Sequence, residues 1–233
     1  MGIVWILVSE SIPFFSHVSF REFLTGTEWT PLFENAKYGI LPLLCGTLLA
    51  TTIALAVAIP LGTVSAAFLS EYVGPSIREI LKPILELLAA VPTVVYGYFA
   101  LLFVTPLLQR VFPSLGGFNV LSAGLVMGIM IVPYVSSLSE DAMRSVANHL
   151  REGSFAMGAS RFQTIFRVII PAAFSGMTSA YILAISRALG ETMVVAIAAG
   201  MQPNLTYDPT EPAATITAFI VQVSMGDLPH GSI

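Results

Sequence analysis

Charged residues are scarce in this chain of 233 residues. Only 10% of the residues are Asp, Glu, Lys or Arg, whereas soluble domains average about 25%. Residues 38–70, 87–109 and 111–139 contain no charge at all. Each of these runs exceeds the roughly 20 residues that a helix needs to cross a bilayer. The composition therefore predicts an all-α integral membrane protein, a polytopic helical bundle.

Other absences exclude several classes of protein. A single cysteine, Cys45, excludes a disulfide framework and a cysteine metal site. His17, His149 and His230 are far apart, so we expect no catalytic residues, no metal and no cofactor. No loop ends in Gly-Lys-Ser or Gly-Lys-Thr, so the chain cannot itself hydrolyse ATP. The net charge of −4 is small and spread out, which argues against a nucleic-acid partner.

The apolar segments predict about five membrane spans in one domain, residues 1–233. The first is short and lacks the basic start of a signal peptide. The segment 213–225 is too short for a further span. The predicted spans are residues 1–15, 41–69, 80–109, 120–138 and 168–200.

Basic residues predict the orientation in the membrane. Six of them lie in the connections on one side: Arg78, Lys82, Arg144, Arg151, Arg161 and Arg167. Three lie on the other side: Arg21, Lys37 and Arg110. Because cytoplasmic loops carry the excess of Lys and Arg, we expect residues 139–167 in the cytoplasm and residues 201–233 outside.

The charged segment 139–167 has the pattern of two short amphipathic helices joined at Gly158. The apolar spacing i, i+3, i+4, i+7 occurs twice, at Met143, Val146, Ala147 and Leu150 and at Phe162, Ile165, Phe166 and Ile169. Ser160 and Gln163 predict a capping box that restarts the helix after the glycine. The pattern alone fits a surface loop on the membrane as well as a docking element for a cytoplasmic partner.

The stretch "EGSFAMGASRFQTIFRVIIP", residues 152–171, resembles the cytoplasmic signature of bacterial ABC importer permeases. In those permeases the segment is a coupling helix that inserts into a groove of the ATPase subunit. Gly153 and Ser154 stand where the signature usually has two alanines, and both are also small residues. The resemblance implies a cytoplasmic coupling segment over residues 139–171. Its implied ATPase contacts are Glu152, Gly153, Ser154, Phe155, Ala156, Met157, Gly158 and Pro171.

Three further stretches narrow the resemblance. "GTLLATTIALAVAIPLGTVSAAFLSEY" (residues 46–72) resembles the opening of the permease core. "ELLAAVPTVVYGYFAL" (86–101) and "ISRALGETM" (185–193) resemble the phosphate-specific ABC permeases, in particular their C-type subunit. That family normally has another transmembrane helix after a stretch such as "GDLPHGSI" (226–233), so we expect the chain to lack the final helix.

The resemblance implies a multi-pass subunit of the bacterial plasma (inner) membrane that imports phosphate. Its expected partners are a cytoplasmic ATPase dimer, a second permease subunit, a periplasmic or lipid-anchored phosphate-binding protein, and membrane lipid. Two alternatives remain open. The substrate could be another oxyanion, such as molybdate or sulfate. The chain could also be an ion-driven secondary transporter or channel, which would need no ATPase docking segment.

Arg187 and Glu191 are the only charges between Arg167 and Asp208. A charge at mid-bilayer costs roughly 2.5–3.5 kcal/mol, so such residues face the bundle interior or an aqueous path. The two residues have the i, i+4 spacing of a buried ion pair. Alternatively, Arg187 faces the translocation path and binds phosphate through its planar fork of donors, while Glu191 accepts the proton of hydrogen phosphate.

Residues 80–109 add polar candidates for the substrate path, namely Glu86, Thr93 and Tyr96. Pro92 predicts a kink here, and Thr93 and Tyr96 could instead satisfy backbone groups freed by this proline. Glu86 could also pair with Arg187 across helices. In the next span, "GLVMG" (124–128) predicts close packing between helices.

Overall fold

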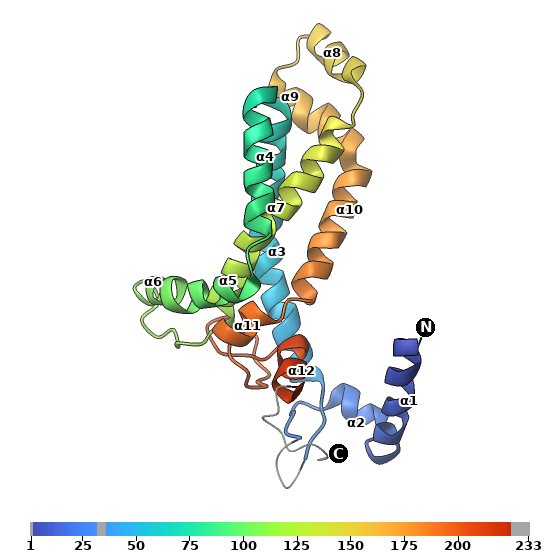
Figure 1. The fold of residues 1–233 in the computed structure, drawn as a ribbon, viewed down its shortest axis with the longest axis vertical. Coiled ribbons are helices and arrows are strands. Elements are labelled where there is room, and N and C mark those ends of the chain that lie inside the picture. Colours follow the sequence, from blue (N-terminus) through green and yellow to red (C-terminus); the bar gives the residue numbers. More distant parts are fainter. Residues whose placement is uncertain (1, 32–35, 225–233) are drawn as a thin grey trace.

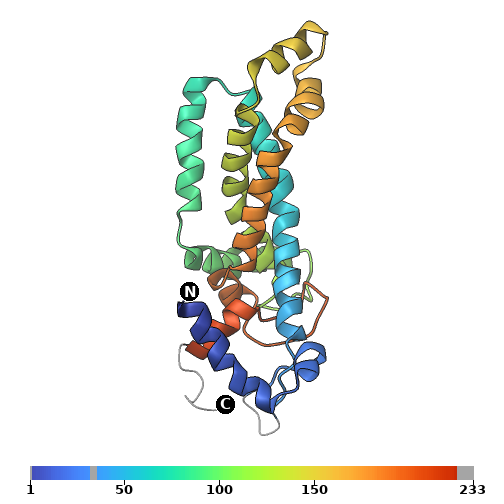
Figure 2. The same ribbon diagram turned by 90° about the vertical axis from the view of Figure 1, so that its right-hand side faces the viewer.

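The computed structural model describes residues 2–31 and 36–224. Its centre is formed by three long helices that lie side by side (Figures 1 and 2). They are α3 (Leu41–Glu71), α7 (Val120–Arg144) and α10 (Ile170–Leu189). Each is long and apolar enough to cross a membrane, once α10 is counted together with the helical turns that precede it from Arg161. The all-α bundle is thus confirmed.

The prediction of one continuous span over residues 80–109 is wrong, because the segment is bent. Helix α4 (Pro75–Ala89) begins before the predicted start, and a second helical stretch over Thr93–Gln109 is bent away from it by 81°. Figure 1 shows α4 upright and the second stretch running across the bundle. Pro92 causes the break, because it lacks an N–H and disfavours helical geometry in the residue before it. The second stretch consists of α5 (Thr93–Phe99), the π-helix η1 (Ala100–Val104) and α6 (Thr105–Gln109).

The described residues hold three candidate spans, or four if the bent pair counts as one. The first segment does form a helix, α1 (Gly2–His17), but its 16 residues are short for a span. It is followed by the short α2 (Phe20–Thr25). The region 226–233, on which the expectation of a missing final helix rests, lies outside the described residues.

The last predicted span, residues 168–200, ends early. Helix α10 stops at Leu189, and a short helix, α11 (Met193–Ala198), follows after a break of three residues. Gly190 ends the helix, as expected of a residue with little helical preference. Arg187 therefore lies in the last turn of α10 and not near the middle of a span. A final short helix, α12 (Ile216–Ser224), packs beside α11 and α3.

Helices α3 and α7 form the most extensive contact of the bundle. A Cβ atom added to Gly124 would lie 2.8 Å from Ile53, and one added to Gly128 would lie 2.8 Å from the Ala54 carbonyl. Ala50 and Ala54 on the facing side of α3 are fully buried. These small residues let the two backbones approach closely, which confirms the packing predicted for "GLVMG".

The first backbone N–H groups of α7 are all bonded, although a helix cannot supply their acceptors. Val120 N–H donates to the Glu211 carbonyl at 3.1 Å, and Leu121 N–H donates to the Pro209 carbonyl at 2.7 Å. Ser122 N–H donates to the side chain of Asn119 at 2.7 Å. The irregular segment between α11 and α12 thus holds the start of α7.

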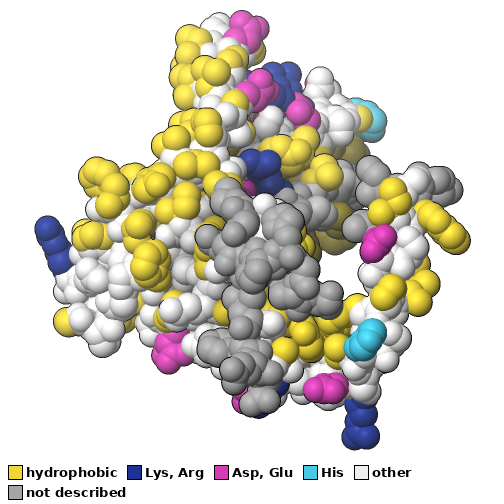
Figure 3. All heavy atoms as spheres, turned by 60° about the horizontal axis from the view of Figure 1, so that its bottom comes forward, with side chains coloured by type: hydrophobic (Ala, Val, Ile, Leu, Met, Phe, Trp, Pro, Cys, Tyr) yellow, Lys and Arg dark blue, Asp and Glu magenta, His cyan; other side chains and the backbone are white. Residues whose placement is uncertain are grey.

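The two ends of the molecule differ. Helix α8 (Asn148–Ala156) and α9 (Arg161–Thr164) form one end, and α1, α2 and α12 lie toward the other (Figures 1 and 2). Figure 3 brings the α12 end forward and shows hydrophobic side chains over much of the surface, with charged groups scattered among them. Exposed apolar side chains of this kind suit a lipid surface.

Candidate functional site

The first predicted amphipathic helix of the charged segment is wrong. Helix α7 ends at Arg144 and α8 begins at Asn148, so the apolar face predicted from Met143 to Leu150 crosses a break in the helix. Met143 and Val146 are buried, but Leu150 on α8 is exposed. Of the four residues in the predicted spacing, Met143 and Val146 alone are buried.

The turn after α8 is confirmed. Gly158 has φ +84°, a conformation that residues with a side chain rarely adopt. The capping box also forms: Ser160 accepts from Gln163 N–H, and the Gln163 side chain accepts from Ser160 N–H at 2.9 Å. Helix α9 therefore starts at Arg161, three residues after the glycine, and the chain turns between α8 and α9.

The apolar residues predicted to share one face of the second helix, from Phe162 to Ile169, lie on two faces. Ile165 and Ile169 are buried, whereas Phe162 and Phe166 are exposed, with ring centroids 4.6 Å apart. The segment Ile165–Ile169 is the π-helix η2, whose wider turn changes the faces that the predicted spacing assumed. The two phenylalanines are thus available to a partner or to lipid.

The residues predicted to contact an ATPase gather at the tip formed by α8 and the following turn. Met157 is 88% exposed, and Phe155 is exposed beside it. Ser154 is half-buried, and its hydroxyl lies 2.9 Å from that of Thr164. Glu152, Gly153, Ala156, Gly158 and Pro171 are also exposed. Pro171 stands apart from the tip, in the first turn of α10.

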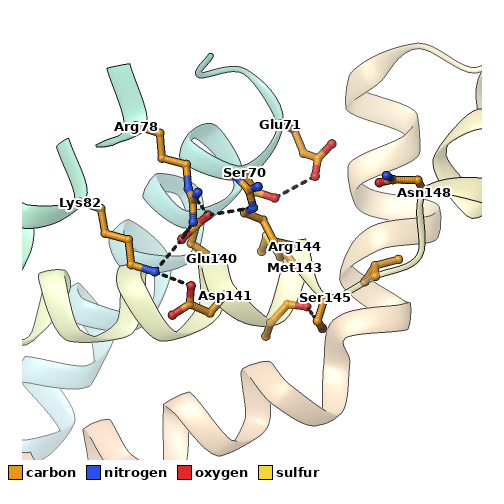
Figure 4. Close-up of polar contacts among 12 residues, drawn as sticks. Ser70, Glu71, Arg78, Lys82, Glu140, Asp141, Met143, Arg144, Ser145 and Asn148 are labelled. Carbon is orange, nitrogen blue, oxygen red and sulfur yellow. Dashed lines mark hydrogen bonds and ion pairs between the residues drawn. The ribbon is translucent and has the colours of Figure 1, made fainter. Parts of the chain in front are cut away.

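An ion cluster centred on the buried Glu140, not predicted from the sequence, joins α4 to α7 (Figure 4). The Glu140 side chain is 1% exposed and accepts from Arg78 Nε at 2.6 Å and from Arg78 Nη2 at 3.1 Å. Lys82 Nζ lies 3.3 Å from the second Glu140 oxygen and also pairs with Asp141. The alternating charges at the end of an apolar span were the available signal, but the partners lie about sixty residues apart in the sequence.

Arg187 and Glu191 do not form an ion pair in the part of the chain that the structure describes. The Glu191 carboxylate is buried and accepts the Val194 N–H at 3.3 Å, at the start of α11. The Arg187 guanidinium lies over the Tyr134 ring, 5.8 Å from its centroid. Ala180 and Ala184, which precede Arg187 on α10, are buried. The break between α10 and α11 separates the two charges.

Of the other path candidates, Tyr96 is half-buried on α5. The Tyr96 hydroxyl donates to the Leu88 carbonyl at 2.8 Å, which is the carbonyl that Pro92 leaves without its helical donor. Thr93 is half-buried at the first position of α5. Glu86 is exposed on α4, and no ion pair with Arg187 forms among the described residues.

Comparisons with known proteins agree with this architecture. Residues 58–224 match the family described as "Binding-protein-dependent transport system inner membrane component". The chain is 38% identical to the probable ABC transporter permease protein YqgH of Bacillus subtilis, over 93% of this chain and 70% of that one. It is 32% identical to the phosphate transport system permease protein PstC of Mesorhizobium japonicum, over 91% of this chain and 71% of that one.

A solved structure shares the fold. It is a bacterial ABC transporter involved in the import of the acidic polysaccharide alginate, with a TM-score of 0.58 and 16% sequence identity. The match covers 95% of this chain and 84% of the other. The chain therefore belongs to the binding-protein-dependent transport system inner membrane components, the permeases of ABC importers, and is a membrane transport subunit rather than an enzyme.

Proposed function

We propose that the chain is a permease subunit of an ATP-driven phosphate importer and that Arg187 contacts the anion. Arg187 carries the proposal, because the residue is half-buried and its guanidinium makes no hydrogen bond or ion pair with any described residue. Leaving donors unpaired in a poorly hydrated place is costly unless a ligand takes them. A guanidinium matches the oxygens of phosphate with two parallel hydrogen bonds.

Phosphate suits the surroundings of Arg187 better than sulfate does. Hydrogen phosphate carries an O–H that a carboxylate can accept, and sulfate has no such proton at neutral pH. Glu191 uses Oε1 for the Val194 N–H, and no described residue donates to its Oε2. Thr93 and Tyr96 supply further polar groups to the proposed path. The names of PstC relatives point to the same anion.

The two ends of the molecule are proposed to bind different partners. The tip residues from Glu152 to Gly158 dock on a cytoplasmic ATPase dimer, which places the α8 end inside the cell. A phosphate-binding protein delivers the anion at the opposite end. A second permease subunit completes the path, and exposed Glu86 on α4 lines that path only in the assembled transporter. Lipid covers the remaining exposed apolar side chains.

The proposal is tested by uptake into proteoliposomes that contain the chain, a second permease subunit and the ATPase, with the binding protein outside. We expect ATP-dependent uptake of phosphate, and little uptake of sulfate or molybdate. Equal or faster uptake of either competing oxyanion would reassign the substrate. Uptake driven by an ion gradient without ATP would instead support a secondary transporter.

Gly158→Val is expected to abolish co-purification of the ATPase while leaving membrane insertion intact. A β-branched residue is strained at φ +84°, so the turn would open and move the exposed Met157 away from its docking position. Space around the glycine is open, so the effect comes from the backbone alone. Gly74→Ala is the matched control, because Gly74 also has open space but ordinary dihedral angles. Wild-type ATPase yield from an inserted Gly158→Val variant would contradict the docking surface.

A further inference from the structure

The coupling tip is joined to the bundle by two routes. One is covalent, because α9 continues through η2 into α10. The other is polar and runs through Arg151, on the side of α8 that faces the bundle. We propose that Arg151 is a positioning residue that transmits movement of α8 to α3 and α7. The proposal rests on the proposed function, since it concerns how an importer permease responds to its ATPase.

Arg151 first holds the end of α7. Its Nη2 donates to the Met143 carbonyl at 2.7 Å, and its Nη1 donates to the Val146 carbonyl. These carbonyls lie in the last turn of α7 and just beyond it, where a helix leaves acceptors without intrahelical donors. A cation at this end also interacts favourably with the helix dipole. The guanidinium therefore adds a donor to the Met143 carbonyl, which also accepts the Val146 N–H at 3.3 Å, and supplies one to the Val146 carbonyl in the break between α7 and α8.

The same guanidinium holds the end of α3. Its Nε and Nη2 lie 3.3 and 3.2 Å from Glu71 Oε1, and Glu71 is the last residue of that helix. The Ser70 hydroxyl donates to the same oxygen at 2.8 Å. The Arg151 and Glu71 side chains are only 14% and 11% exposed, so water screens their attraction weakly. One side chain on α8 is thus bonded to the ends of two spans.

These two spans pack closely against each other. The close approach at Gly124 and Gly128 leaves no room for one backbone to move along the other. A displacement of α8 that pulls on Arg151 is consequently applied to α3 and α7 as one body, while α10 receives its displacement through the chain itself. The covalent route acts first on α10 and the polar route acts first on α3 and α7. Helix α10 also packs on α7, where a Cβ added to Gly176 would lie 2.7 Å from Ala142.

Arg151→Lys in the assembled transporter tests this role. Lysine keeps the charge toward Glu71 but presents its donors at one point, so it cannot span the carbonyls of α7 and the carboxylate of α3 together. We expect the number of phosphate ions transported per ATP hydrolysed to fall about tenfold, the loss of roughly one charge-assisted hydrogen bond. ATPase co-purification and ATP hydrolysis without binding protein should not change. Arg144→Lys is the control, because Arg144 is 46% exposed and lies 3.8 Å from its partner Glu140.

An unchanged transport ratio in Arg151→Lys would overturn the proposal. So would a loss of transport that merely follows a loss of bound ATPase, because that is the outcome of a structural defect. A rise in ATP hydrolysis relative to uptake, with ATPase still bound, would support it.

A second measurement uses the unaltered Arg151 and does not depend on how its variant folds. Spin labels at His149 and Tyr72, both exposed, report the separation of α8 from the end of α3, with Cys45 replaced by serine. We expect the same separation in the nucleotide-free complex and with ATP bound. A separation that changes between these states would show that α8 moves independently of α3. Because this distance requires no uptake, it tests the inference even if the substrate is not phosphate.

Discussion

Substitution of Arg187 by lysine is expected to reduce phosphate uptake by the assembled transporter roughly ten- to hundredfold, with normal assembly. The lysine keeps the positive charge but loses the planar fork of donors. A hydrogen bond to a charged group contributes about 1.5–3 kcal/mol, and each 1.4 kcal/mol corresponds to about a factor of ten. Initial uptake rates, normalised to permease protein and bound ATPase, measure the effect.

Variants of Glu191 distinguish a substrate contact from a structural role of Arg187. Glu191→Gln keeps an oxygen that accepts the Val194 N–H, so it should preserve the start of α11. The double variant Arg187→Gln with Glu191→Gln should assemble but remain inactive. If the two residues were a structural pair, removing both would leave no unpaired charge and uptake would return. Recovery of uptake in the double variant would therefore refute the assignment of Arg187.

Glu140→Ala should lower the stability of the permease more than any other single charge removal at the α8 end. The carboxylate is buried between α4 and α7 and accepts from Arg78 and Lys82. Removing one partner of a buried pair typically costs about 3–5 kcal/mol, because the remaining charge is uncompensated. We expect a lower apparent Tm in detergent and a lower yield of monodisperse protein.

Asp141→Asn provides the matched control for Glu140. Asp141 also pairs with Lys82, but its side chain is 53% exposed, and an exposed pair contributes only about 0–1 kcal/mol. The two variants remove one negative charge each from adjacent positions. Equal Tm values for Glu140→Ala and Asp141→Asn would mean that burial of Glu140 does not determine the strength of this cluster.

The sequence predicted the apolar helices well because hydrophobicity and capping are local properties. The charge-free runs placed α3 and α7 close to their observed starts, at Leu41 and Val120. The chemistry of Ser160 and Gln163 predicted a cap that formed, and Gly158 marked the turn. Each of these features depends on residues a few positions apart.

The parts that were missed depend on geometry between distant residues. Pro92 signals a break but not its 81° angle, and the helix that follows packs against the distant α11. The interpretation of Arg187 and Glu191 as an i, i+4 pair required a continuous helix, and the break at Gly190 removed that condition. The contact of Arg151 with Glu71 spans eighty residues, so no local pattern could reveal it.

The bonds at the start of α7 impose an order on biosynthesis. The acceptors for Val120 and Leu121 are carbonyls of Glu211 and Pro209, which leave the ribosome about 90 residues later. At roughly 5–20 residues per second, that interval lasts on the order of 5–20 s. During this time the start of α7 must rely on water, lipid headgroups or the insertion machinery for its N–H groups. The nascent permease therefore completes the start of α7 only after the segment that follows α11 has been synthesised.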